Sequence, residues 1–240
     1  MGKVSAFHFT PVQERFLTAL LGDPYIPATF YLTGGTALAA CYLNHRVSED
    51  IDLFSPLALD EQRIVATISG RIGPIAKTID YVRIHDRLGY TITLPNNQKL
   101  KVDVVSYPYE LLENSEKTYH GLAIDSIADI GVNELMTISQ RTASKDYVDL
   151  YFILKKYTMW DLRHGVAHKF KMDIEPLYAA SLYSNVDQLT TMPIMKKKLT
   201  LEALKTFFLK EAKTLAAPLL NLSRVRLHAS AILSPTSHHG

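Results

Sequence analysis

The sequence predicts an α/β (α+β) protein, with a mixed sheet flanked by helices over residues 1–155 and a helical domain over residues 156–240. Segments that alternate apolar and polar residues, as half-buried strands do, occur only in the first half of the chain. From residue 126 onward, nearly every segment has the apolar spacing of a helix. The composition, 47% hydrophobic and 21% charged, is that of a globular protein with a sizeable core.

The first predicted element is a helix near the N-terminus. Thr10 is a suitable N-cap, Pro11 fits the first helical position, and Gln13 completes a capping box. Gly22 fits the end of this helix. The β-branched and aromatic residues of 29–33 then predict a strand.

A turn, a helix and a second strand are predicted next. Gly34 and Gly35 favour a tight turn, residues 36–43 favour a helix, and the run Ile-Asp-Leu-Phe at 51–54 favours a strand. Three later strands are expected to be antiparallel neighbours. The later predicted segments are a helix at 60–72, strands at 78–86, 90–95 and 99–108 with a turn at 96–97, helices at 126–142, 145–157 and 200–220, and a loose tail at 230–240.

The cysteine content and the hydropathy pattern restrict the compartment. Cys41 is the single cysteine, which excludes an intrachain disulfide and favours a reducing cytoplasm. No apolar run approaches the roughly 20 residues needed to cross a bilayer, so no membrane association is expected. The N-terminal segment has neither the apolar core nor the cleavage site of a signal peptide.

Charge is distributed unevenly along the chain. Residues 1–150 contain 13 Lys and Arg against 18 Asp and Glu, a net charge of −5, whereas residues 151–240 contain 13 against 6, a net charge of +7. Such asymmetry can mark a surface for nucleic acid or an acidic partner, although a solvated basic helical face would explain it equally well. The run Lys196, Lys197 and Lys198 contributes to the basic half.

Two carboxylates lie one residue apart at the start of the second predicted strand. Because successive side chains of a strand point to opposite faces, Asp50 and Asp52 share one face, while Ile51 and Leu53 share the other. Two adjacent carboxylates repel each other, and a divalent cation such as Mg²⁺ removes that conflict. A solvent-facing pair on an edge strand is the alternative explanation.

The turn before this strand has the features of a phosphate site. Glycines at 34 and 35 permit close approach of a ligand to the main chain, and the first N–H groups of the following helix are free to bind an anion. Thr36 could cap that helix or donate its hydroxyl to a phosphate. A simple turn between a strand and a helix would use the same glycines. The prediction of a phosphate site therefore depends on the order of the features, with the glycine turn first, then a helix, then the paired carboxylates.

A third carboxylate completes the predicted set. Asp103 lies among β-branched residues and shares a strand face with Lys101 and Val105. If this strand lies beside the strand that follows Asp50, three carboxylates converge. Such a set can hold two metal ions about 3.5–4 Å apart, which suits in-line transfer of a nucleotide from a nucleoside triphosphate.

These motifs resemble the nucleotidyltransferase superfamily of DNA polymerase β type and, more closely, the AbiEii-type abortive-infection toxin family. The first motif of that family corresponds to GGTAL at 34–38 and RVSEDIDLF at 46–54. The second corresponds to KVDVVS at 101–106, and a later helical motif corresponds to KDYVDLYFIL at 145–154. The segment 181–208 is similar to the C-terminal pattern of the family, so the resemblance covers most of the chain.

The resemblance implies a polymerase-β-like nucleotidyltransferase domain and a role for each motif residue. Asp50, Asp52 and Asp103 would be catalytic and would hold Mg²⁺, with two ions during catalysis. The implied nucleotide-binding residues are Gly34, Gly35, Thr36, Arg46, Ser48, Lys145 and Asp146. An alternative for the helical motif is an exposed ion pair between Lys145 and Asp149, which are four residues apart.

One position departs from the pattern of the family. Glu134 stands where the family carries a lysine, and a carboxylate there cannot pair with a triphosphate. Either Arg141 or Lys145 takes over this role, or activity is weakened or lost.

Three functions are therefore compatible with the sequence. The first is a metal-dependent nucleotidyltransferase that modifies RNA, such as a tRNA, as the toxin of a pair with a cognate antitoxin protein. The second transfers a nucleotide to a small molecule such as an antibiotic. The third is a degenerate member that binds a nucleotide or a partner protein without catalysis, which Glu134 would favour.

Overall fold

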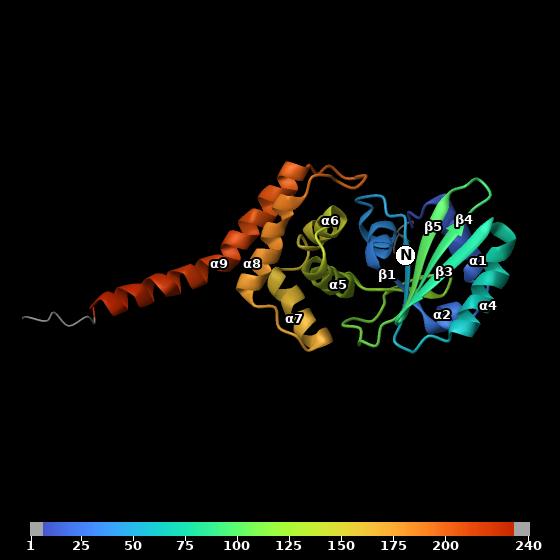
Figure 1. Cartoon of the computed structure of the whole chain (residues 1–240), viewed down its shortest axis with the longest axis horizontal. Coiled ribbons are helices and arrows are strands. Elements are labelled where there is room, and N and C mark those ends of the chain that lie inside the picture. The colour runs from blue at the N-terminus through green and yellow to red at the C-terminus, as the bar shows by residue number, and fades with distance from the viewer. Residues whose placement is uncertain (1–6, 233–240) are drawn as a thin grey trace, which may run out of the picture.

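The computed structural model describes residues 7–232, which form a seven-stranded mixed sheet beside a group of helices (Figure 1). The strand order is β3-β4-β5-β2-β1-β7-β6. The α/β architecture with C-terminal helices expected from the sequence is confirmed. The strands are β1 Tyr31–Thr33, β2 Ile51–Ser55, β3 Thr78–Ile84, β4 Arg87–Thr93, β5 Lys99–Ser106, β6 Lys117–Tyr119 and β7 Leu122–Ile124.

The helices fall into two groups along the chain. Those of the first half are α1 Pro11–Leu20, α2 Tyr25–Thr29, α3 Gly34–Thr36, the π-helix η1 Ala37–Leu43, α4 Glu61–Ile72 and the 3-10 turn η2 Gly73–Ile75. Those of the second half are α5 Ile127–Gln140, α6 Ser144–Ile153, α7 Met159–Phe170, α8 Pro176–Ser184, the 3-10 turn η3 Asn185–Gln188 and α9 Leu201–Ile232.

The start of α1 confirms the predicted capping box and also fixes a distant loop. The Thr10 hydroxyl accepts a hydrogen bond from the backbone N–H of Gln13, and the Gln13 side chain accepts one from the backbone N–H of Thr10. The buried Gln13 amide then donates to the carbonyl oxygen of Ser48 over 2.9 Å. The first helix therefore supports the loop that leads into β2.

The central strands pair as the alternating pattern requires. β3, β4 and β5 are antiparallel neighbours, as predicted, while β2 is parallel to β5 and antiparallel to β1. Ile51, Leu53, Val102 and Val104 point into the core, so the intervening polar residues point to the other face.

Three local predictions from the sequence are corrected. The strand predicted at 29–33 begins only at Tyr31, because Thr29 ends the short helix α2. The hairpin of β6 and β7 was not predicted, because its turn uses His120 and Gly121 at positive φ rather than a familiar Asn-Gly pair. Residues 230–232 of the predicted tail belong to α9, and the rest of that tail lies outside the described residues.

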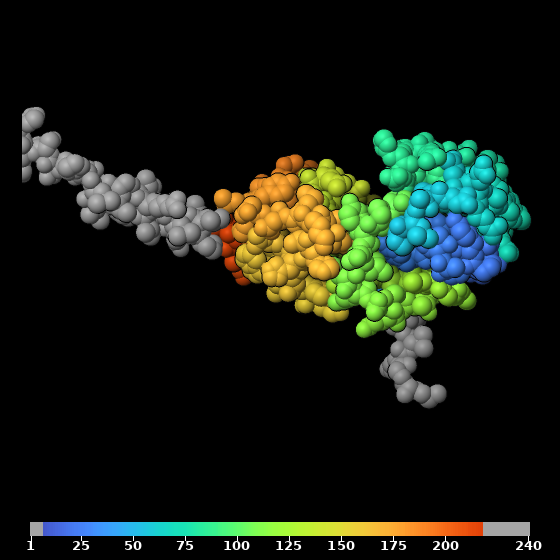
Figure 2. All heavy atoms as spheres, turned by 90° about the horizontal axis from the view of Figure 1, so that it is seen from below, coloured from blue at the N-terminus to red at the C-terminus, as the bar shows by residue number. Residues whose placement is uncertain are grey.

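The helical half lies directly beside the sheet. α5 contacts α6 and α7, both α5 and α6 contact α3, and α8 packs along α9. In Figure 2 the green segment after β5 lies between the blue and cyan surface of the first half and the orange surface of the later helices. The domain boundary near residue 155 stays a prediction. Within residues 7–232, no helix combines the length and the apolarity that crossing a bilayer requires.

Candidate active site

A cavity of about 480 Å³ opens between the sheet and helices α5 and α6. Nine of the ten predicted site residues line it, so segments far apart in the sequence meet here. The sheet side contributes Gly34, Gly35, Asp50, Asp52 and Asp103, the loop before β2 contributes Arg46 and Ser48, and α6 contributes Lys145 and Asp146.

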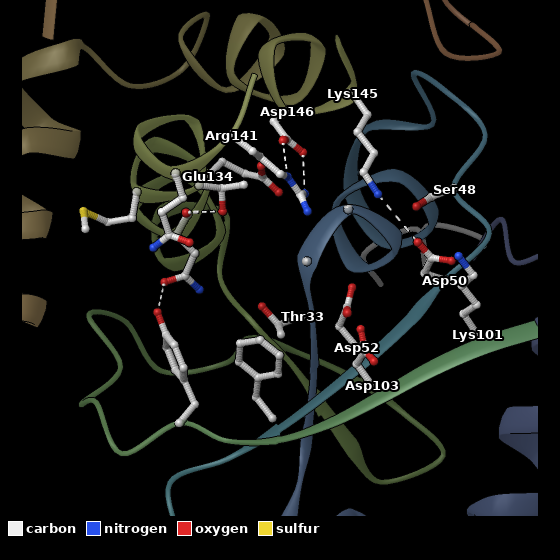
Figure 3. A pocket seen from close by; sticks show the side chains of 18 of the residues that line it. Thr33, Ser48, Asp50, Asp52, Lys101, Asp103, Glu134, Arg141, Lys145 and Asp146 are labelled. Atoms are coloured by element: carbon white, nitrogen blue, oxygen red, sulfur yellow. Dashed lines mark hydrogen bonds and ion pairs between the residues drawn. The ribbon is translucent and has the colours of Figure 1, made fainter. Parts of the chain in front are cut away.

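The three predicted carboxylates lie on the sheet wall of this cavity. Asp52 and Asp103 are register partners on the parallel strands β2 and β5, and their side chains lie side by side (Figure 3). Asp50 stands one residue before β2 rather than within it, and it is more exposed. Withdrawal from water, followed by the charges of Asp103 and Asp50, raises the pKa of Asp52 to about 7. The site therefore concentrates negative charge.

Basic side chains partly neutralise these carboxylates. Arg87 on β4 donates from Nε to Asp103 over 2.8 Å, and the Lys145 ammonium lies 3.6 Å from Asp50. Within residues 7–232, no three His, Cys, Asp or Glu side chains already stand as a metal-ligating group.

The residues nevertheless fit a divalent cation. Arg87 and Lys145 are about half exposed, so both can turn toward solvent and release Asp103 and Asp50. The donor atoms left are then carboxylate oxygens alone, which hard cations such as Mg²⁺ prefer. Besides burial, the charges of Asp103 and Asp50 raise the pKa of Asp52, and a bound cation would offset that repulsion.

The two glycines make room for neighbouring side chains of the site. Gly34 has a φ of +69°, and a Cβ at this position would lie 2.5 Å from Oδ2 of Asp52. A Cβ at Gly35 would collide with the Arg46 guanidinium. Any larger residue would therefore displace a carboxylate or an arginine of the site. Approach of a phosphate to this turn stays a prediction.

Thr36 is the predicted site residue that does not line the cavity. It is buried, its hydroxyl donates to the carbonyl oxygen of Asp50, and it lies 2.9 Å from the Ser48 hydroxyl. With Gln13, it holds the loop before β2 in place. Thr36 therefore positions Asp50 through the main chain, and its predicted contact with a nucleotide stays a prediction.

A buried ion cluster lies behind Gly35. Arg46 donates from Nε and a terminal nitrogen to the two carboxylate oxygens of Asp149, over 2.6 and 2.5 Å. His45 Nε2 lies 2.7 Å from the same carboxylate. Burial opposes the charge of Asp149, but the hydrogen bonds from Arg46 and His45 hold its pKa below the ordinary value.

The alternative of an exposed ion pair between Lys145 and Asp149 is wrong. Asp149 is fully buried and faces Arg46, whereas the half-exposed Lys145 faces Asp50. Helical spacing puts residues four apart near each other, but burial decides the partners here. Asp146, on the same helix, accepts two hydrogen bonds from Arg141, over 2.8 and 2.9 Å.

Several cavity residues were missed from the sequence. Arg87 is one, because its place beside Asp103 follows from the pairing of β4 with β5, in which Gly89 is the register partner of Asp103. A Cβ at Gly89 would lie 3.3 Å from Oδ1 of Asp103, so this glycine marks a close approach to the carboxylate. Phe54, Tyr107 and Asn133 also line the cavity and were not singled out, because aromatic and amide residues in strands and helices are common.

The cavity residues belong to motifs that a family model also matches. The match to the model described as nucleotidyl transferase AbiEii toxin, type IV toxin–antitoxin system, spans residues 15–219. The chain belongs to this AbiEii family. The resemblance stated from GGTAL and RVSEDIDLF is thereby confirmed.

Individual relatives agree with this assignment. The AbiEii chain is 34% identical over 136 residues to an uncharacterized protein of Aquifex aeolicus, and it spans 61% of the length of that relative. Its structure is similar to JHP933 of Helicobacter pylori, with a TM-score of 0.55, 21% identity, and coverage of 90% of this chain and 96% of that one. It is also similar to MenT4, a nucleotidyltransferase toxin of Mycobacterium tuberculosis, with a TM-score of 0.51, 16% identity, and coverage of 85% and 82%. These likenesses support a nucleotidyltransferase fold.

Proposed function

We propose that this AbiEii protein transfers a nucleotide from a nucleoside triphosphate to a nucleic acid acceptor, such as a tRNA, in a Mg²⁺-dependent reaction. It would act in the cytoplasm as the toxin of a pair with a cognate antitoxin. The observation that carries the proposal is the convergence of Asp50, Asp52 and Asp103 beside Gly34 and Gly35 in one cavity. Membership of a nucleotidyltransferase toxin family of type IV systems supports it.

The side chains of the cavity suit this chemistry. Asp50, Asp52 and Asp103 would hold the divalent cation, which supplies charge neutralisation at the triphosphate and activates the attacking hydroxyl. Four basic residues of the same cavity can donate hydrogen bonds to phosphate oxygens. They are Arg87, Lys101, Arg141 and Lys145. Because phosphoryl transfer depends mostly on positioning and charge, these residues need only align the acceptor hydroxyl with the phosphate.

A groove of about 230 Å³ beside the cavity supports a macromolecular acceptor. It shares Arg46, Ser48, Asp50 and Lys145 with the cavity, and its outer wall is formed by Pro193 and Ile194. An acceptor in this groove would therefore reach the carboxylate wall without crossing the nucleotide.

The outer wall of this groove belongs to a fixed segment of the C-terminal half. The N–H of Val47 donates to the carbonyl oxygen of Ile194, and the N–H groups of Lys196 and Lys197 donate to that of His45, over 2.8–2.9 Å. The exposed Lys196, Lys197 and Lys198 therefore lie next to the groove. Their place suits the phosphates of a bound RNA.

Replacing Lys196, Lys197 and Lys198 by Ala is expected to weaken RNA binding and to flatten its salt dependence. RNA binding releases fewer counterions when fewer lysines contact phosphates. The slope of log K against log salt should therefore decrease in magnitude by about 1 for each lysine removed. Nucleoside triphosphate binding should stay nearly constant, because screening limits the reach of these charges to roughly 8–10 Å. The measurement is RNA affinity at several salt concentrations for both proteins.

A matched control replaces Lys99, exposed at the start of β5, together with Lys77 and Lys171, by Ala. The control variant loses the same net charge away from the groove and should keep most of the RNA affinity. Equal losses in both variants would point to net charge rather than to the groove. Absence of any salt-dependent RNA binding by the wild type would favour a small-molecule acceptor.

The direct test of the function is incubation with each labelled nucleoside triphosphate, Mg²⁺ and total tRNA, with and without EDTA. Label transferred to RNA in a chelator-sensitive way is the expected result. Label found on a small molecule would favour transfer of the antibiotic type. Nucleotide binding with no transfer to any acceptor would favour a degenerate member.

A further inference from the structure

The wall of the cavity formed by α5 differs in chemistry from the carboxylate wall. Glu134 lies on the side of the cavity opposite Asp52 and Asp103 (Figure 3). Asn133, the preceding residue of α5, lines the same cavity. Phe54 on β2 and Tyr107 after β5 add aromatic rings, whose centroids lie 4.8 Å apart. This part of the cavity combines flat apolar surfaces with polar groups.

Two buried polar atoms on this wall have no hydrogen-bond partner within residues 7–232. They are Nδ2 of Asn133 and Oε2 of Glu134. The Tyr107 hydroxyl donates to Oδ1 of Asn133 over 3.0 Å, which fixes the amide and leaves its nitrogen as the unused donor. Buried polar atoms are nearly always satisfied in folded proteins. Two such atoms on consecutive residues beside a cavity therefore indicate a ligand that satisfies both.

We propose that Asn133 and Glu134, with Phe54 and Tyr107, bind the nucleobase of the nucleoside triphosphate and determine which base is accepted. This inference rests on the proposed function. A nucleobase has flat faces that pack on aromatic rings and an edge of donors and acceptors that amide and carboxyl groups can read. The triphosphate would then extend toward Gly34, Lys145 and Arg87, where the carboxylate wall and its cations lie.

The protonation of Glu134 supports this role. Burial raises its pKa well above the ordinary value, and the nearby charges of Asp149 and Asp146 act in the same direction, against Arg46 and Arg141. The raised pKa favours the protonated carboxyl, which can both donate and accept a hydrogen bond. Protonation lessens the repulsion between this side chain and a nucleotide, so the departure from the lysine of the family is compatible with nucleotide binding.

The test measures the affinity of each of the four nucleoside triphosphates, and of inorganic tripolyphosphate, for the full chain. Asn133→Ala and Glu134→Ala remove the proposed base contacts, whereas Glu134→Gln keeps a side chain of the same size that donates and accepts hydrogen bonds. Ser139→Ala is the control, because Ser139 lies on α5 and its hydroxyl donates to the carbonyl oxygen of Met136 in the same helix. Melting temperatures identify any variant that fails to fold.

The expected result is a loss of base selectivity. The ratio of the tightest to the weakest triphosphate affinity should fall about tenfold or more in Asn133→Ala and Glu134→Ala, since unpaired polar groups discriminate strongly. Tripolyphosphate affinity should change less than about twofold in both variants, and Glu134→Gln and Ser139→Ala should retain wild-type selectivity.

Two outcomes separate this inference from the proposed function. If the wild type binds triphosphates and both alanine variants keep its base selectivity, the base lies elsewhere and the inference is overturned while the function stands. If the wild type binds neither nucleoside triphosphates nor tripolyphosphate, the proposed function itself fails, and this inference fails with it.

Discussion

Replacing Asp52 by Asn is expected to abolish nucleotidyl transfer while leaving the fold intact. The change keeps the size of the side chain and removes one charge from the carboxylate wall, where Asp52 faces Asp103. Loss of a preorganised charged group of this kind lowers the rate by a factor of about 10²–10³ or more. The measurement is transfer of labelled nucleotide by both proteins, together with their circular dichroism spectra.

The same substitution should raise stability at neutral and alkaline pH. The pKa of Asp52 is raised to about 7, so its ionisation disfavours the folded state. The folded chain therefore loses stability as the pH rises from about 4, the unfolded pKa of Asp, to about 7. Asn cannot ionise, so the melting temperature of Asp52→Asn should exceed that of the wild type by an amount that grows over this window and is constant above it.

The effect of a divalent cation on the melting temperature provides a second test of the role of Asp52. Mg²⁺ should raise the melting temperature of the wild type, because a ligand that binds only the folded state stabilises it, and should raise that of Asp52→Asn much less. Asp80→Asn is the control, since Asp80 is exposed on β3 and does not line the cavity. Undiminished turnover by Asp52→Asn would exclude metal-dependent chemistry at these carboxylates.

The features of this site that depend on neighbouring residues in the sequence could be predicted, whereas those that depend on contacts between distant segments could not. The alternation of Ile51, Asp52 and Leu53 between the two faces of β2 follows from the two-residue period, and the capping box at Thr10 follows from neighbouring residues. The pairing of β2 with β5 joins distant segments, so it could not be predicted from local patterns. The sequence therefore predicted that Asp52 and Asp103 converge only if these two strands are neighbours. The structure meets that condition, and the α/β fold class is confirmed with it.

The partners of charged residues were the least predictable feature. Spacing along α6 suggested Lys145 for Asp149, but Asp149 lies in the interior and pairs with Arg46, more than one hundred residues earlier. Likewise, the space that the missing side chain of Gly35 leaves for Arg46 was not predicted. A turn between a strand and a helix does not reveal which side chain will approach it, because that depends on tertiary packing.

Replacing Asp149 by Asn is expected to cause the largest loss of stability. The substitution leaves Arg46, which is 4% exposed, without its counter-ion and leaves His45 with a weaker partner. Removing one member of a buried ion pair costs about 3–5 kcal/mol, because the remaining charge stays out of water. For a chain of this size the melting temperature should fall by on the order of 10 °C. Thermal and urea unfolding of both proteins measure the loss.

Asp146→Asn is the matched control, three residues earlier on the same helix. Asp146 is also buried, but its partner Arg141 is 55% exposed and can return to water, so the loss should be about 1 kcal/mol or less.

The pH dependence of the stability of Asp149→Asn provides a second check. Because the pKa of Asp149 is lowered in the folded chain, its contribution is present above about pH 4 and disappears as the pH falls further. The difference between wild type and Asp149→Asn should therefore hold from pH 5 to 8 and narrow in acid. Equal losses in Asp149→Asn and Asp146→Asn would mean that burial of Arg46 does not determine the cost of removing its counter-ion.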